Sequence, residues 1–149
     1  MLGRKSKYEK RDYLKQFKIG KATYSESLIY EAYGGLQNDG IMLAVYYDVD
    51  AAKIIHQLDS WEKINDSPTI SSILKNVSSY FGLDFVIPEI ASGNFFLYDN
   101  SQHKELRSEA EMNTLLLHSE DVNFSLVVWD DEKHTIYIVA VSYTHLRAH

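Results

Sequence analysis

Two aspartates separated by one residue, Asp48 and Asp50, are the side chains in this sequence whose type and spacing best suit a chemical reaction. On an extended backbone, residues i and i+2 project to the same side, so the two carboxylates can share one hard cation. A divalent cation held in this way orients and neutralises the phosphate groups of a substrate. The pair therefore indicates a Mg²⁺ site with Asp48 and Asp50 as ligands and catalytic residues, completed by a third carboxylate such as Asp84 or Asp99.

The surroundings of these aspartates add a short resemblance. The glycine pair Gly34-Gly35, a gap of twelve residues and then Asp-Val-Asp-Ala resemble the polymerase-beta-like nucleotidyltransferases over fewer than twenty residues, which implies metal-dependent nucleotidyl transfer. The chain departs from that family, whose aspartates usually begin a strand and whose motif usually has glycine-serine. A strand that ends in D-x-D also resembles phosphatases of the haloacid dehalogenase type, which need further lysine and acidic motifs. The alternative is structural: Asp48 ends a strand, and Asp50 caps the next helix.

Other catalytic patterns in the sequence are incomplete. Asp131-Glu132-Lys133 matches the D/E-x-K element of a common nuclease core, but a hairpin turn is sufficient to explain it. The chain has no cysteine, which excludes thiolate chemistry and cysteine-bound zinc. Four histidines precede the C-terminal tail, and none stands at the spacing of a local zinc site: His56, His103, His118 and His134.

Charge is unevenly distributed along the chain. Residues 1–21 carry eight basic and two acidic side chains, a net charge of +6, whereas residues 22–140 carry six basic and nineteen acidic side chains, a net charge of −13. We therefore describe a basic N-terminal arm, residues 1–21, followed by one acidic domain, residues 22–140. The arm either contacts nucleic acid, lies on the acidic domain or extends into solvent. The nucleic-acid contact would use Arg4, Lys5, Lys7, Lys10 and Arg11.

Tyrosine is abundant around the first apolar run and the segment before it. Its ring buries area while its hydroxyl group keeps a polar partner, which suits both the rim of a core and a protein interface. Two interpretations stay open, ordinary core packing and an exposed binding face. The residues concerned are Tyr24, Tyr30, Tyr33, Tyr46 and Tyr47.

The C-terminal tail has a separate resemblance. Residues 141–149, V-S-Y-T-H-L-R-A-H, are similar to one translated reading frame of the transposon-end adapter that is used to prepare sequencing libraries. The adapter bases before that frame are compatible with the codon of Ala140. We therefore expect the tail to be a sequencing artefact. A strand over Thr135–Ala140 would then have a natural continuation that the sequence does not supply, so the protein is expected to be a fragment.

Helical periodicity and capping signals predict the elements around the candidate aspartates. Two capping boxes, Thr23-x-x-Glu26 and Ser108-x-x-Glu111, each satisfy backbone N–H groups at a helix start. Asp50 is a further N-cap, and glycine follows two of the helices. We expect helices over Lys5–Phe17, Thr23–Tyr33, Asp50–Trp61, Pro68–Phe81 and from Ser108 onward.

The strands are predicted from apolar runs and turn signals. Ile41–Tyr47 is apolar or aromatic without alternation, which is typical of a strand covered on both faces, so we place it centrally. Further strands are expected over Phe85–Ile87, Asn94–Tyr98, Phe124–Trp129 and Thr135–Ala140, the last two forming a hairpin. Together these elements predict an α+β fold, with a mixed, mostly antiparallel sheet of about five strands packed with four to five helices.

The sequence favours a small protein that binds another macromolecule, without catalysis, through an acidic, tyrosine-containing surface. This hypothesis needs no cofactor and has another protein as the partner. The alternatives are a metal-dependent phosphoryl or nucleotidyl transferase that uses Asp48, Asp50 and Mg²⁺, and nucleic-acid association through the basic arm. No apolar stretch approaches the length of a membrane span, and the absence of cysteine fits a reducing compartment, so we expect a cytoplasmic protein. Neither the oligomeric state nor the identity of the partner follows from the sequence.

Overall fold

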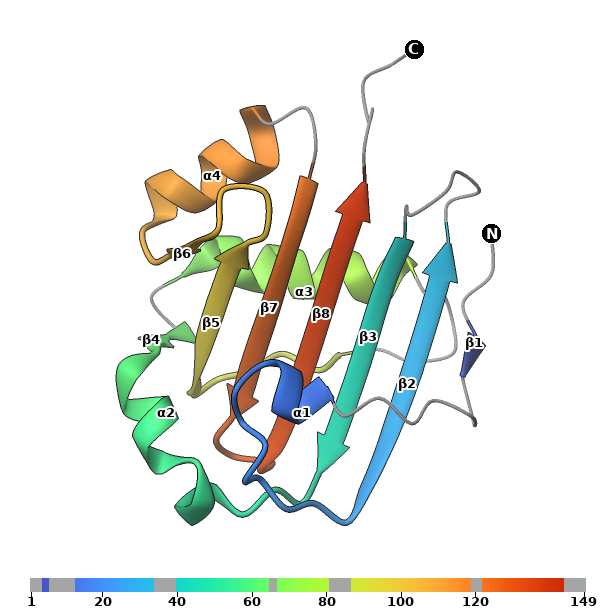
Figure 1. The fold of residues 1–149 in the computed structure, drawn as a ribbon, viewed down its shortest axis with the longest axis vertical. Helices are drawn as coiled ribbons and strands as arrows, with labels where there is room; N and C mark the ends of the chain where they lie inside the picture. The colour runs from blue at the N-terminus through green and yellow to red at the C-terminus, as the bar shows by residue number, and fades with distance from the viewer. Residues whose placement is uncertain are drawn as a thin grey trace.

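The computed structural model describes residues 4–5, 13–33, 40–64, 67–80, 87–118 and 122–143. Its centre is an eight-stranded sheet in the order β1-β2-β3-β8-β7-β5-β4, in which β6 also pairs with β5 (Figure 1). All pairings among these strands are antiparallel. The strands are β1 (Arg4–Lys5), β2 (Glu26–Tyr33), β3 (Gly40–Tyr47), β4 (Glu62–Lys63), β5 (Gly93–Asp99), β6 (Lys104–Leu106), β7 (Val122–Asp130) and β8 (Thr135–Tyr143).

The predicted α+β class with four to five helices is wrong. Of the described residues, 41% are in strands and 30% in helices, and the helices are short, so the fold is mostly β. The mixed sheet of about five strands is likewise replaced by the larger antiparallel sheet. The described helical segments are α1 (Tyr13–Gln16), the 3₁₀ turn η1 (Ala51–Lys53), α2 (Ile55–Ser60), α3 (Pro68–Tyr80) and α4 (Glu109–His118).

The helix predicted over Thr23–Tyr33 accounts for much of this error, because that segment contains β2. Ile29 is buried on one face of the sheet and Tyr30 on the other. A strand that buries both faces has apolar residues at adjacent positions, and a short run of that kind also matches helical spacing. The β-branched and aromatic residues of the segment, together with pairing along the whole of β3, favour the strand.

Two other predicted elements differ from the structure. Of the helix expected over Lys5–Phe17, the described residues include α1, whereas Lys5 belongs to β1; residues 6–12 lie outside the described part. Ile87, expected to end a strand, is not in a strand, and residues 85–86 are not described.

Several local predictions are confirmed. β3 lies between β2 and β8 and is buried along almost its whole length. Pro68 begins α3, and the Ser108 capping box opens α4, where Glu111 N donates to Ser108 Oγ at 3.1 Å and Ser108 N donates to Glu111 Oε1 at 3.3 Å. β7 and β8 form the predicted hairpin, closed by the pair Asp130–Thr135.

The two faces of the sheet are covered differently (Figure 1). The α3 face is packed by α3 and is mainly apolar. One of its rows across five strands is fully apolar and buried: Tyr30, Leu43, Val139, Leu126 and Leu97. The opposite α1 face is packed by α1, by the segment after it and by α2, and its buried residues form a second core cluster.

Candidate functional site

Asp48 and Asp50 flank Val49 where the chain leaves β3 for η1. The φ angle of Asp48 is 56°, so its backbone is left-handed rather than extended, and its carboxylate accepts a hydrogen bond from Ser25 Oγ. Asp50 Oδ1 accepts the backbone N–H of Ala52 at 3.1 Å and is the N-cap of η1, as the structural alternative predicts. Each carboxylate therefore has a local hydrogen-bond partner.

Asp99 lies at the opposite end of the sheet from Asp48. It is in one row with Phe124, Val141 and Ile41. Since Ile41 and Asp48 are seven positions apart, the two aspartates are separated by roughly 24 Å at about 3.4 Å per strand residue. Asp99 Oδ1 accepts two backbone N–H groups of the turn after β5, at 2.9 and 3.2 Å. Asp99 is therefore too distant to complete a site with Asp48.

The other candidate metal ligands that the structure describes lie apart from one another. Asp84 lies outside the described residues, and in the described part no group of three His, Cys, Asp or Glu side chains is close enough to hold a metal ion. Asp131-Glu132-Lys133 lies in the turn between β7 and β8. Asp130 Oδ1 fixes that turn by accepting the backbone N–H groups of residues 132 and 133, at 3.0 and 3.2 Å. His56 is exposed on α2, His103 and His134 lie in turns with positive φ, and the His118 side chain is not described.

The structure describes residues 4–5 and 13–21 of the basic arm. Arg4 and Lys5 form β1 at the edge of the sheet, whereas Lys7, Lys10 and Arg11 lie outside the described residues. Residues 13–21 of the arm belong to the folded core, because their apolar side chains pack on the α1 face. These residues are Tyr13, Leu14 and Ile19.

The described tyrosine side chains do not form one exposed face. Tyr30 and Tyr46 are buried on opposite faces of the sheet, and Tyr47 is half-buried. Tyr24 is 45% exposed and places its ring edge-on to Tyr46 at 4.9 Å. The side chain of Tyr33 is not described.

The α1 face changes from apolar to polar between two neighbouring rows of residues. One row is apolar and lies under the α1 and α2 segments: Ile29, Ala44, Ile138, Val127 and Phe96. The next row towards the upper end of the sheet in Figure 1 is more polar: Glu31, Met42, Ala140, Ser125 and Tyr98. Met42 and Ser125 are buried, whereas Glu31, Ala140 and Tyr98 are half-buried.

A groove of about 590 Å³ lies on this second row. We call it the α1-face groove. Its floor is the row itself, and its wall is α1 with the residues that follow, including Gln16, Phe17 and Lys18. Lys18 has a φ of 69° and follows the last turn of α1, where Lys18 N donates to Lys15 O at 3.0 Å. Lys18 is an exposed cation, and Glu31 is a half-buried carboxylate of the same groove.

Three half-buried aromatic rings border the groove along β5. The rings of Trp61 and Phe96 are 6.1 Å apart at 30°, and those of Phe96 and Tyr98 are 6.2 Å apart at 17°. Phe96 and Tyr98 line the groove, and Trp61 continues the series towards α2. The nearly parallel rings form a strip on which another flat group can stack.

A network of amides fixes the end of the groove beside Tyr98. Asn100 Nδ2 donates to Asn123 Oδ1 and to Ser125 Oγ, both at 3.1 Å, while its backbone N–H donates to Asn123 O at 2.9 Å. Asn100 Oδ1 has no hydrogen-bond partner among the described residues. The site therefore offers a hydrogen-bond acceptor next to an aromatic surface.

The sequence contained one signal for this groove that was overlooked. Within β5, Asn94, Phe96 and Tyr98 alternate with buried residues, and Asn100 continues this alternation just after the strand, so they share the less buried face. The groove itself depends on register across five strands, which no local pattern gives.

No protein-family model matches the chain, and no curated protein or solved structure matches it significantly. Among the described residues, no helix is long and apolar enough to cross a membrane.

Proposed function

We propose that this protein is a non-catalytic binding module that holds a peptide segment of a partner protein in the α1-face groove. The observation that carries the proposal is the groove of about 590 Å³ that Glu31, Ser125 and Lys18 line beside the stacked rings of Phe96 and Tyr98. A flat or ring-shaped side chain of the peptide stacks on these rings. Polar backbone groups of the peptide meet the amides at Asn100 and Gln16.

Charge narrows the class of partner. Residues 22–140 carry a net charge of −13, so a basic protein approaches this domain favourably. Within the groove, Lys18 and Glu31 supply one charge of each sign. We infer that the bound segment carries an acidic side chain near Lys18 within an otherwise basic partner. The lack of cysteine is consistent with a cytoplasmic location, which we include in the proposal.

Selection from a displayed library of random peptides tests the proposal. We expect peptides that bind with micromolar dissociation constants and that contain an aromatic residue or proline. Tyr98→Ala should weaken them at least tenfold, because the stacking surface is shortened. Ile55→Ala, which changes an exposed residue on α2, serves as the matched control and should leave binding unchanged.

A charge reversal gives a second readout that misfolding cannot imitate. When the library is selected on the Lys18→Glu variant, the recovered peptides should carry a basic residue in place of the acidic one. The variant should fold normally, because Lys18 is exposed and lies outside the core. Recovered peptides that bind Tyr98→Ala and Lys18→Glu as well as the parent protein would exclude the groove. A library that yields no specific binder would also contradict the proposal.

A further inference from the structure

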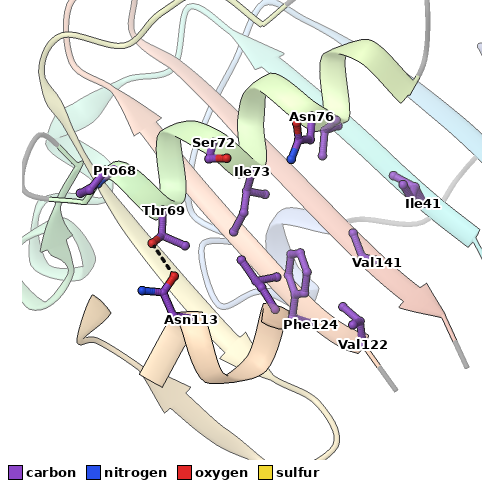
Figure 2. A pocket seen from close by; sticks show the side chains of 12 residues that line it. Ile41, Pro68, Thr69, Ser72, Ile73, Asn76, Asn113, Val122, Phe124 and Val141 are labelled. Atoms are coloured by element: carbon purple, nitrogen blue, oxygen red, sulfur yellow. Dashed lines mark hydrogen bonds between the residues drawn. The ribbon is translucent and has the colours of Figure 1, made fainter. Parts of the chain in front are cut away.

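α3 and α4 are joined near their N-terminal ends by one carboxylate. Glu109, the first residue of α4, accepts hydrogen bonds from the hydroxyl groups of Ser67 and Thr69 and from the backbone N–H of Thr69 at 3.3 Å. One turn further along α4, Asn113 Oδ1 lies 3.2 Å from Thr69 Oγ1. Beyond this junction a cavity of about 580 Å³ lies between the two helices and the α3 face of the sheet (Figure 2).

The cavity has an apolar interior. Figure 2 shows Ile73 pointing from α3 towards the sheet, with Phe124 and Val141 projecting from the strands opposite. Ile41, Val122 and Leu116 add further apolar surface. None of the twelve described residues that line the cavity carries a charge. A charged ligand would therefore lose hydration without gaining a counter-ion, which costs several kcal/mol in general.

Four polar side chains of the lining belong to the helices: Thr69, Ser72, Asn76 and Asn113. Thr69 has a single hydroxyl proton, and Glu109 Oε1 at 2.5 Å is a closer and charged acceptor than Asn113 Oδ1 at 3.2 Å. When the Thr69 hydroxyl group donates its hydrogen bond to Glu109, Asn113 Oδ1 remains available to accept a hydrogen bond from a ligand. If the amide turns by 180°, Nδ2 donates to Thr69 Oγ1, and Asn113 Oδ1 is again left to accept from a ligand.

Ser72 and Asn76 lie on α3 and are exposed. Neither side chain has a hydrogen-bond partner among the described residues. The lining thus combines an apolar interior with a few unpaired donors and acceptors, at a volume within the roughly 300–1,000 Å³ of ligand pockets.

We propose that this cavity is a binding site for a small, uncharged molecule with an apolar body and one or two hydrogen-bonding groups. The apolar body lies against Phe124, Ile73 and Leu116, and the polar groups meet Asn113, Ser72 and Asn76. This site is on the opposite face of the sheet from the α1-face groove, so the proposal does not depend on the peptide-binding function.

Fluorescence titration with N-phenyl-1-naphthylamine tests the proposal, because this neutral probe brightens in apolar surroundings. Its matched charged analogue is 8-anilino-1-naphthalenesulfonate, which has the same rings and one sulfonate. We expect saturable binding of one neutral probe per chain and at least tenfold weaker binding of the sulfonate. Methyl-resolved NMR should show the largest shifts at Ile41, Leu116, Val122 and Val141.

Two substitutions locate the bound probe. Leu116→Trp places a large ring in the cavity, and Ser72→Phe blocks it from an exposed position that leaves the core intact. Each should weaken the neutral probe at least tenfold, whereas Ile55→Trp on α2 and Tyr98→Ala in the α1-face groove should not. If the neutral probe does not saturate, if the sulfonate binds equally well, or if Ser72→Phe has no effect, the proposal is overturned.

Discussion

Glu109 and Thr69 are forty residues apart in sequence, yet the Glu109 carboxylate accepts both the backbone N–H of Thr69 at 3.3 Å and its hydroxyl group at 2.5 Å. Ser67 Oγ accepts the backbone N–H of Ile70 at 3.2 Å at the same helix end. α4 therefore supplies part of the N-terminal cap of α3 through Glu109. The negative charge of the Glu109 carboxylate lies at the positive end of the α3 dipole.

Replacing Glu109 by alanine should lower the free energy of unfolding by about 1 kcal/mol, the usual effect of removing a helix cap. Burial acts to raise the pKa of Glu109, but hydrogen bonds from Ser67 and Thr69 outweigh it and lower that pKa. A lowered folded-state pKa gives stability that is present above the ordinary value of 4.5 and is lost as the pH falls through the folded-state pKa. Urea denaturation between pH 3 and 7 measures this loss. Glu109→Gln, which keeps the shape without the charge, should show less of the acid dependence; an unchanged pH profile would contradict the assignment.

Tyr137 should resist ionisation at alkaline pH. Burial, with additional contributions from Asp130 and Tyr47, raises its pKa well above the ordinary value of 10.0. Because the folded state holds the proton more tightly, the associated stability is complete below pH 10 and is lost as the pH rises towards the folded-state pKa. Absorbance of tyrosinate during an alkaline titration should show that Tyr137 ionises only on unfolding. Tyr137→Phe should reduce the absorbance step at unfolding by one tyrosine and flatten the stability profile above pH 10. If the step is not reduced in this variant, another tyrosine is responsible.

Gly93 is required by the close approach of β5 to β7. A Cβ atom at this position would lie 1.8 Å from the carbonyl oxygen of Trp129, which is backbone and cannot move without breaking the strand pair. Gly93→Ala should therefore lower the free energy of unfolding by about 3 kcal/mol or more, in the upper range of overpacking effects. Gly20→Ala is the control, because its Cβ would meet Lys15 at 3.2–3.4 Å. Thermal melts that rank the two variants equally would contradict this account.

The metal alternative at Asp48 and Asp50 can be decided by calorimetric titration with MgCl₂ and MnCl₂. The carboxylates accept hydrogen bonds from Ser25 and Ala52, so we expect no saturable binding. Asp48→Asn, which still tolerates the left-handed backbone, should keep the fold. Metal binding by the parent protein that Asp48→Asn abolishes would instead support the transferase hypothesis.

The tail that resembles a sequencing adapter begins inside β8. Val141 is 6% exposed and pairs with Ile41 and Phe124, so Val141→Ala should lower the free energy of unfolding by about 1–3 kcal/mol. Resequencing the locus across the codon of Ala140 is expected to give a different continuation. If Val141 and the residues after it are recovered unchanged, the adapter interpretation is wrong.

Local chemistry predicted the elements that carry strong signals of their own. Pro68 and the Ser108 capping box marked two helix starts, and the unbroken apolar run of β3 indicated a strand covered on both faces. The segment of β2 was predicted as a helix because Ile29 and Tyr30 are buried on opposite faces of the sheet. Adjacent apolar residues of this kind also occur in short helices. β1, β4 and β6 are too short to produce a periodic signal.

The candidate site was less predictable than the fold. Glu31, Met42, Ser125 and Tyr98 are neighbours only because four strand pairings bring them into one row with Ala140. A shift of one residue in any register would move the side chains of that strand to the other face. In the structure, Asp48 accepts a hydrogen bond from Ser25, and Asp50 caps η1.

The pairing of β3 with β8 joins segments from opposite ends of the chain, Met42 with Ala140 for example. During synthesis, the β2–β3 hairpin emerges about ninety residues before β8, a delay of roughly 5–20 s at ordinary translation rates. Throughout that interval the nascent chain presents the apolar strand β3 with one unpaired edge, and an unpaired edge is prone to wrong pairing with other chains. Newly made protein is therefore more vulnerable to aggregation than the finished fold, and shielding of β3 by a chaperone would improve its yield.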